Sequence, residues 1–69
     1  MELNRIKVVL VERKKTGKWL IEKLGKNEAT ISRCCTNEIQ PTLITLFEIS
    51  RVLDVDIREL LIRSKNNML

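Results

Sequence analysis

The chain has 69 residues, near the lower limit for a domain that folds alone, so we expect one domain with one core. Aromatic residues make up 3% of it and hydrophobic residues 43%, so packing must depend on Leu, Ile and Val. There is no histidine, and the adjacent Cys34 and Cys35 favour neither a disulfide nor a zinc site. No apolar run is long enough to span a membrane and no signal-peptide pattern is present, which predicts a soluble, cytoplasmic chain without a cofactor.

Positive charge is concentrated in the first half of the chain. The net charge is +4, and residues 1–33 carry nine basic and four acidic side chains, whereas residues 34–69 carry four and five. This distribution favours a polyanionic partner. The alternative is a solvated helix end, where the helix dipole stabilises cations. The residues that this alternative explains are Lys7, Arg13, Lys14 and Lys15. The charge distribution alone favours a solvated helix end. Together with the pattern of two helices hinged at Gly25, it favours a polyanionic partner.

The first predicted helix spans residues 3–14. Its residues recur three or four positions apart, the spacing that brings side chains to one face of a helix. The residues that show this spacing are Ile6, Val9, Leu10 and Arg13. The run from Val8 to Val11 would also suit a strand, but it is short and its flanks are charged helix formers, so a helix is favoured.

Two short helices follow, hinged at Gly25. Thr16 is a suitable N-cap for the first of them, and Gly25 ends it as the residue that most readily takes a left-handed conformation. Asn27 caps the second helix, which runs to about Cys35, and Asn37 replaces glycine at the next turn. The outer face of this second helix carries short polar side chains and one arginine, which is typical of a helix that is presented to DNA.

Two further helices are predicted in the second half of the chain. The fourth begins after Pro41 with Thr42 as its N-cap, and the fifth begins at Asp56. The residues expected to be buried are Leu43, Leu46, Phe47, Ile49 and Leu53 on the fourth helix, and Leu60 and Leu61 on the fifth. Residues 64–69 are predicted to form a frayed polar tail, so the domain covers residues 1–63.

With these helices in order, the sequence resembles the Cro/repressor helix-turn-helix family, often called Xre, from about residue 4 to residue 62. The residues that carry the resemblance are Asn4-Arg5-Ile6-Lys7, Leu20, Glu22-Lys23-Leu24-Gly25, Thr30-Ile31-Ser32-Arg33, Pro41-Thr42-Leu43, Val52-Leu53, Val55 and Glu59-Leu60-Leu61. No single one of these short segments is specific to the family, but the spacing of all of them together is specific to it. The resemblance implies a compact, all-α, five-helix, lambda-repressor-like domain that binds double-stranded DNA with residues 27–35 in the major groove.

The resemblance also implies roles for individual residues. The family's base-reading positions fall on Glu28, Ala29, Ser32 and Arg33. Arg33 fits this role best, since a guanidinium can donate two parallel hydrogen bonds to guanine, whereas Glu28 could instead stabilise the helix N-terminus. The residues expected to contact the DNA backbone are Thr16, Lys18, Lys26, Asn27 and Thr30, with Thr30 also suited to a base edge. For Lys26, ordinary solvated surface is an alternative.

Several positions depart from the family pattern. Gly17 replaces a glutamine that typically bonds a phosphate. Leu10 and Cys35 replace a buried ion pair, so we expect Cys35 to pack near Leu10 rather than to serve redox chemistry. Three apolar residues stand where other residue types are usual, namely Val8, Val11 and Trp19. Trp19 is expected to cover the core, and the two valines to lie under the fifth helix or the C-terminal tail, unless all three bind a protein partner.

Together these features predict a transcriptional regulator that catalyses no reaction, because the sequence offers no nucleophile with a base, no phosphate-binding glycine loop and no metal site. It would bind as a homodimer, with a dimer surface that the resemblance puts around Leu53 to Ile57. One alternative is an antitoxin that binds a protein toxin and represses its own operon. Another is a protein-interaction module that has lost DNA binding.

Overall fold

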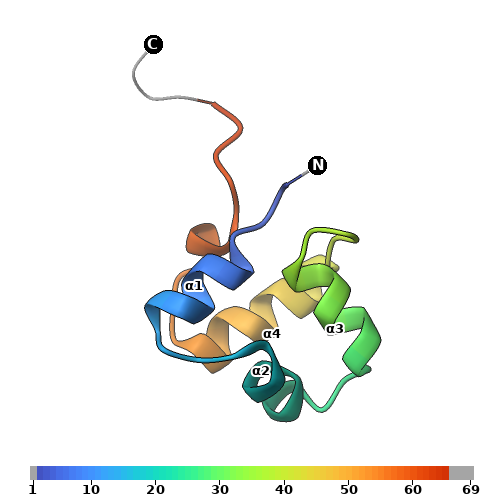
Figure 1. Ribbon diagram of the computed structural model, residues 1–69. Coiled ribbons are helices and arrows are strands. Elements are labelled where there is room, and N and C mark those ends of the chain that lie inside the picture. The colour runs from blue at the N-terminus through green and yellow to red at the C-terminus, as the bar shows by residue number, and fades with distance from the viewer. Residues whose placement is uncertain (1, 66–69) are drawn as a thin grey trace.

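The computed structural model describes residues 2–65, which fold into four α-helices and one 3-10 helical turn (Figure 1). These elements are α1 (Ile6–Glu12), α2 (Gly17–Leu24), α3 (Glu28–Cys35), α4 (Leu43–Leu53) and the 3-10 turn η1 (Ile57–Leu60). Within this part of the chain, β-type pairing is limited to an isolated antiparallel bridge between Asn4 and Leu61. The all-α fold is therefore confirmed, with a 3-10 turn in place of the fifth helix.

The helices around the hinge begin and end at the predicted caps. The side-chain oxygens of Thr16, Asn27 and Thr42 accept hydrogen bonds from backbone N–H groups three residues further on, at 3.1, 3.0 and 3.2 Å. Gly25 ends α2 with a φ of 64°, and Asn37 has a φ of 62° in the turn after α3. The predicted bounds of α2 and α3 are therefore confirmed.

The first helix is shorter than the predicted range of 3–14, because the chain on both sides of it makes other interactions. Before it, residues 3–5 pair with residues 60–62 through two antiparallel hydrogen bonds of 2.8 and 3.0 Å. After it, Lys14 takes a left-handed backbone conformation with a φ of 58°. The run from Val8 to Val11 lies inside α1 and is helical rather than extended.

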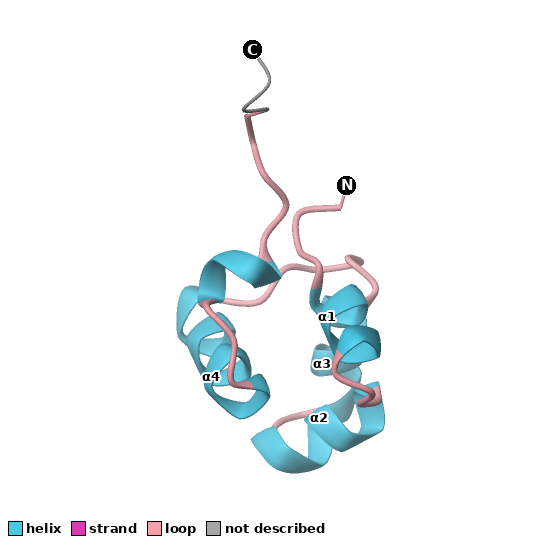
Figure 2. Cartoon of the chain, turned by 90° about the vertical axis from the view of Figure 1, so that its left-hand side faces the viewer, coloured by secondary structure: helices cyan, strands magenta, loops and turns pink. Residues whose placement is uncertain are grey.

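One hydrophobic core joins all five elements, with α4 lying across from α1 and α3 (Figure 2). Its buried residues are Ile6, Val9, Leu10, Leu20, Ile31, Leu46, Ile49, Leu53 and Leu60. A partly buried set packs against them, namely Trp19, Ile21, Leu24, Cys35, Val52, Val55 and Ile57. Cys35 thus packs against the cluster that contains Leu10, as expected, and α2 contacts both α3 and α4. The core holds the two hinged helices as one unit.

The predicted burial is wrong at three positions. On α4, Leu43 and Phe47 are 65% and 51% exposed, and Ile44 beside them is 75% exposed. The buried stripe of α4 follows Leu46, and Phe47 is displaced from it by one position, while Leu43 precedes the part of the helix that the core covers. Leu61 is also exposed, because the short η1 turn carries only its last residue into the core. These apolar side chains form surface rather than core.

The predicted tail is described only in part. Ser64 and Lys65 belong to no helix. Residues 66–69, and with them the proposed cover by Met68 and Leu69, lie outside the described residues. In the part of the chain that the structure does describe, no helix combines the length and the apolar character needed to cross a membrane.

Candidate nucleic-acid interface

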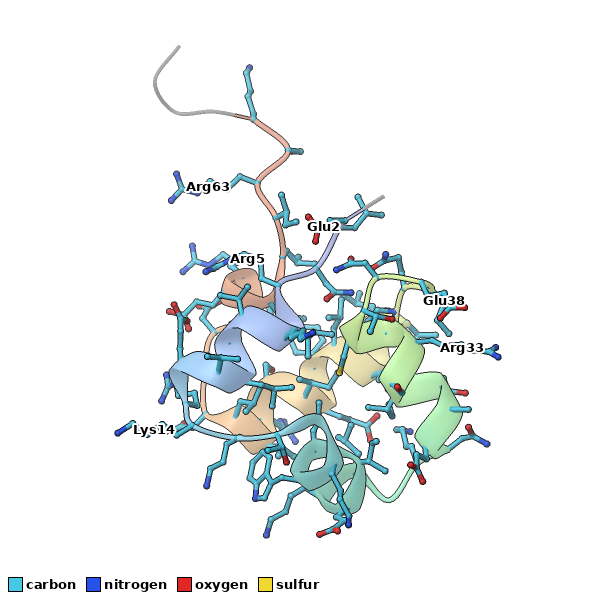
Figure 3. The ribbon with its side chains drawn as sticks, in the orientation of Figure 1. Glu2, Arg5, Lys14, Arg33, Glu38 and Arg63 are labelled. Carbon is cyan, nitrogen blue, oxygen red and sulfur yellow. The ribbon has the colours of Figure 1, made fainter. Side chains whose placement is uncertain are left out.

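Helix α3 separates a buried side from an exposed one. Ile31 and Cys34 are buried in the domain. All the predicted base-reading residues are exposed, namely Glu28, Ala29, Ser32 and Arg33. Their positions are one residue or about one turn apart, so they share a face of the helix. Figure 3 shows Arg33 pointing away from the domain. The structure therefore brings these four residues together on one accessible surface, which we call the reading face.

Four of the residues predicted to contact the DNA backbone lie at helix starts, namely Thr16 and Lys18 at α2, and Asn27 and Thr30 at α3. The Thr16 hydroxyl oxygen is used in capping α2. Asn27 Oδ1 accepts from the backbone N–H of Thr30 at 3.0 Å and faces its hydroxyl at 3.4 Å. The Nδ2 group of Asn27 makes no hydrogen bond within residues 2–65, so it can donate to a phosphate. Lys18, in the first turn of α2, is exposed and has no ion-pair partner among the described residues.

Lys26, in the hinge loop, already has an acidic partner. Its Nζ lies 3.2 Å from Oε1 of Glu48 on α4. That oxygen is shielded from solvent although the carboxylate as a whole is only partly buried, so the ammonium is its main partner. Such a partly exposed pair contributes about 0–1 kcal/mol to stability. Contact with a phosphate would compete with this pair, which makes Lys26 a weaker candidate than Lys18.

Trp19 packs within the domain and carries positive charge on its outer side. The ring is partly buried against the core, and the Nζ atoms of Lys15 and Lys23 lie 4.8 and 6.0 Å from its centroid. A cation over an aromatic ring at an exposed site contributes about 0.5–1 kcal/mol. This arrangement agrees with the packing interpretation of Trp19, and it holds Lys15, just before α2, and Lys23, on α2, over the ring.

The buried amide of Asn4, to which the sequence analysis gave no structural role, holds the C-terminal end of α3. The side chain of Asn4 is only 3% exposed. Its Nδ2 donates to the backbone carbonyl of Cys34 at 2.9 Å and to Oε1 of Gln40 at 2.8 Å. Its Oδ1 accepts from the N–H of Ile6 at 3.2 Å, at the start of α1. Both donors and the acceptor of this amide are therefore satisfied.

Asn37 completes the same network from the other side. Its Oδ1 accepts from the backbone N–H groups of Leu3 and Asn4, at 2.8 and 3.0 Å, and from Nε2 of Gln40 at 3.2 Å. Its Nδ2 donates to the backbone carbonyl of Asn4 at 3.0 Å. We call Asn4, Asn37 and Gln40 the amide clasp. The sequence signals a turn at Asn37, but a partner 33 positions away leaves no local pattern.

The two cysteines serve packing rather than chemistry. Burial raises the pKa of the Cys34 thiol. Burial also raises the pKa of Cys35, and the neighbouring Cys34 adds to this effect while Lys7 opposes it. Because the thiolate is the reactive form, neither thiol is activated. Among residues 2–65, no three histidine, cysteine or acidic side chains come together as a metal site would require.

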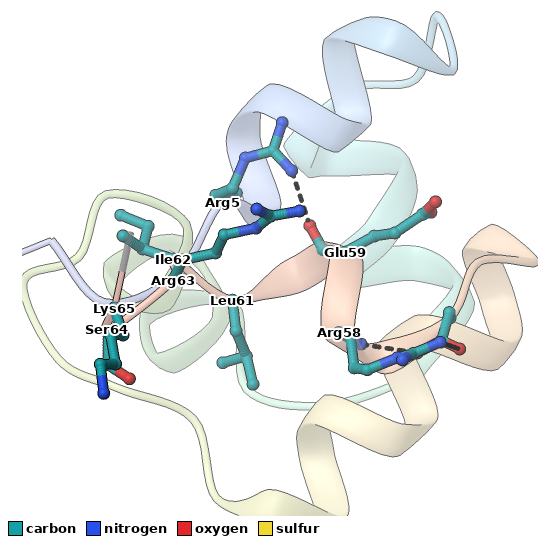
Figure 4. Close-up of a pocket in the computed structure, with 9 residues that line it drawn as sticks. Arg5, Arg58, Glu59, Leu61, Ile62, Arg63, Ser64 and Lys65 are labelled. Atoms are coloured by element: carbon teal, nitrogen blue, oxygen red, sulfur yellow. Dashed lines mark hydrogen bonds and ion pairs between the residues drawn. The ribbon is translucent and has the colours of Figure 1, made fainter. Parts of the chain in front are cut away.

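Two surface hollows lie outside the reading face. One, of about 920 Å³, lies where the C-terminal segment leaves the domain (Figure 4), and its lining includes Arg5, Arg58, Arg63 and Lys65. Two carboxylates also line it, and Asp56 is already bonded by the Arg58 guanidinium at 3.2 and 3.1 Å. That interaction lowers the pKa of Asp56. Figure 3 shows Arg5 and Arg63 away from Arg33, so this cationic hollow is separate from α3.

The second hollow, of about 520 Å³, lies between α1 and the end of α3. Val8 and Val11 line it together with Cys35, and they are 48% and 68% exposed. The expectation that the fifth helix covers these valines is therefore wrong, because η1 packs at the other side of residues 3–5. The alternative cover by the C-terminal tail involves Met68 and Leu69, which lie outside the described residues.

Comparison with known proteins agrees with this geometry. The family model for the Cro/C1-type HTH DNA-binding domain matches residues 5–66. The crystal structure of a candidate DNA-binding protein from Bacteroides fragilis is similar to this chain, with a TM-score of 0.80 and 53% sequence identity. The similarity covers 87% of this chain and 97% of that one. A comparison with curated proteins gave no match.

Proposed function

The chain belongs to the Cro/C1-type helix-turn-helix DNA-binding domain family, and from this premise we propose that it is a sequence-specific transcriptional regulator. In this proposal α3 enters the major groove of double-stranded DNA and α2 braces it across the backbone. The observation that supports it is the reading face, where four exposed side chains share one side of a helix whose other side is buried. The protein acts by binding and catalyses no reaction.

In this proposal the residues of the reading face contact bases, and residues beside it contact the DNA backbone. Arg33 would donate two hydrogen bonds to guanine, Ser32 would contact a neighbouring base edge, and Ala29 would contact a thymine methyl group. Glu28 would accept from a cytosine amino group or stabilise the start of α3. Lys18 and the Nδ2 group of Asn27 would bind the flanking phosphates. These contacts would position the protein on the DNA, whereas the base contacts would select the sequence.

We further infer that two copies bind together, since one short recognition helix reads few base pairs. The exposed side chains of Leu43, Ile44 and Phe47, which we call the α4 apolar face, suit this contact. A two-fold interface sets a surface against itself, so an uncharged face is favoured over the cationic hollow, whose arginines would repel one another. Leu53, in the surface implied by the family resemblance, belongs to the core.

The α4 apolar face is small for a permanent dimer. A specific interface typically buries about 800 Å² on each partner, more than three side chains provide. The dimer is therefore expected to be weak in solution and to form on DNA with two half-sites about one helical turn apart. Ile44→Glu should abolish cooperative binding to paired half-sites and leave binding to a single half-site unchanged. Cooperativity that survives this change would contradict the assigned surface.

The experiment that tests DNA binding itself is a salt titration. Binding to a random-sequence duplex, followed by fluorescence anisotropy, should weaken steeply between about 50 and 200 mM salt, with a slope of about −0.9 per phosphate neutralised in a plot of log affinity against log salt. Absence of binding at the lowest salt would overturn the proposal. It would favour instead a protein-interaction module that has lost DNA binding.

The second candidate function is that of an antitoxin, which would add a protein partner to DNA binding. The exposed Val8 and Val11 beside the hollow between α1 and α3 favour it, whereas the partly buried Trp19, covered by lysines, suits a partner less. Val11→Glu should abolish binding to the protein product of a neighbouring gene and leave DNA binding unchanged. If the variant still binds that product, the valines are not the partner surface.

A further inference from the structure

We propose that the amide clasp is a positioning device for base reading, which fixes the C-terminal end of α3 although none of its three residues belongs to the reading face. The inference rests on the proposed function, because it assigns to Asn4, Asn37 and Gln40 the orientation of the helix that reads DNA. It follows from three features of the clasp: where it grips α3, what it is anchored to, and which predicted contacts lie near it.

The clasp grips α3 at a carbonyl group that the helix itself leaves open. The last carbonyl groups of a helix lack partners within it. Those of Ser32 and Arg33 accept hydrogen bonds from the connector just after the helix. The carbonyl of Cys34 accepts from the backbone N–H of Asn37 in this connector at 3.2 Å, and also from Nδ2 of Asn4, 30 positions earlier in the chain. The other hydrogen bonds that α3 makes within residues 2–65 are to residues close in sequence, whereas the bond from Asn4 joins α3 to a distant segment.

The clasp is itself anchored to the core. Residues 3–5, which carry Asn4, pair with residues 60–62, and the neighbouring Ile6 and Leu60 are fully buried. Asn37 bonds the backbone of this N-terminal segment on its other edge, so its amide takes the place of a third strand. A buried polar group left unpaired is costly, so the clasp closes in one arrangement. The clasp therefore fixes the position of the end of α3 relative to the core.

The clasp lies near the predicted base contact and far from the predicted phosphate contacts. Arg33 directly precedes Cys34, so a small rotation of the helix end displaces its guanidinium, and a bidentate contact to guanine tolerates little displacement. Lys18 and Asn27 lie at the starts of α2 and α3, away from the clasp. Loosening the clasp should therefore reduce discrimination between sequences more than it reduces binding to DNA in general.

The test is the variant Asn37→Gly, with Asp54→Gly as its matched control. Glycine adopts the left-handed backbone of both residues, at φ of 62° and 56°, without strain. Asn37→Gly removes the side-chain bonds that Asn37 makes to Leu3, Asn4 and Gln40. It keeps the bond from Asn4 to the Cys34 carbonyl but frees the connector after α3 from the N-terminal segment. Asp54, at the end of α4, makes no side-chain hydrogen bond within residues 2–65. At a temperature where both variants are folded, we expect the ratio of cognate to random-sequence affinity to fall about tenfold in Asn37→Gly only.

In the same measurements the salt dependence on random DNA should stay unchanged in both variants, because the phosphate contacts are intact. An unchanged affinity ratio in Asn37→Gly, or an equal loss in the control, would overturn the proposal. If Asn37→Gly does not fold, Asn37→Asp serves instead. It keeps Oδ1 as the acceptor but sets a carboxylate oxygen against the Asn4 carbonyl oxygen in place of the donated hydrogen bond. A fall in the ratio is therefore expected here too, and no fall would count against the clasp.

A second readout separates the clasp from the proposed function. Residual dipolar couplings of the free protein report the orientation of α3 relative to α1 and α4 without any DNA. We expect this orientation to change in Asn37→Gly and to stay fixed in Asp54→Gly. If the wild-type protein binds no duplex, the proposed function fails while the clasp is still judged by these couplings, and an unchanged orientation of α3 would overturn it.

Discussion

The two ends of α3 are held in different ways. At its start, Asn27 caps the helix and Gly25 closes the preceding one, and all the residues involved lie within a few positions of each other. At its end, the amide clasp joins Asn37 to a segment 33 positions earlier. The first attachment is local and the second depends on the finished fold. One recognition helix can therefore begin at a position fixed by its own neighbouring residues and end at a position fixed by the rest of the domain.

The largest expected effect is a loss of stability when a core side chain of α3, between its two ends, is removed. Ile31→Ala deletes a side chain of α3 that is almost fully buried. The change should reduce the free energy of unfolding by about 2–5 kcal/mol, because lost burial and a new cavity add together. Urea denaturation followed by circular dichroism measures this. A loss well below that range would mean that the two attachments, rather than the core, hold α3.

Removing the buried amide should be the next largest effect. Asn4→Leu removes two buried hydrogen bonds, the donation to the Cys34 carbonyl and the acceptance from the N–H of Ile6. We expect the free energy of unfolding to fall by about 1–3 kcal/mol, the cost of buried polar groups that lose their partners. Thermal melting of the variant beside the wild-type protein checks this. An unchanged melting temperature would show that water replaces the clasp at no cost.

Arg33→Ala should act on binding alone, since the side chain is exposed and serves neither attachment. If Arg33 makes a bidentate contact to guanine, its loss should reduce discrimination at that base by about 1–3 kcal/mol and leave the melting temperature unchanged. Selection of bound sequences from a random pool, with wild-type protein in parallel, measures the preference. An identical preference in both pools would rule out the role given to Arg33.

The smallest expected effect is at the local attachment. Asn27→Ala removes the cap of α3 and should cost about 1 kcal/mol of stability, whereas Asn27→Ser should restore most of it, because serine is also a good N-cap. Hydrogen exchange of the first turn of α3 resolves so small a change. If alanine and serine behaved alike, the cap would not be what fixes the start of the helix.

The features that the sequence predicted correctly depend on local interactions, and the features that it missed depend on contacts between distant segments. The bounds of α2 and α3 and the exposure of the reading face were predictable, because Thr16, Gly25 and Asn27 act on their neighbours and periodicity marks the buried side. The clasp and the late start of α1 were not, because both depend on pairing between distant segments. Periodicity also gives no measure of how far along α4 the core extends, so the exposure of Leu43 and Phe47 was missed.

The pairing of residues 3–5 with residues 60–62 has a consequence for how the domain can be rebuilt. Figures 1 and 2 show both ends of the described chain leaving the domain on the same side, away from α2. A chain with neighbouring ends can be closed by a short linker and reopened elsewhere, for instance in the exposed turn at Lys14. Circular permutation could therefore introduce new termini at Lys14 without interrupting the hinge at Gly25.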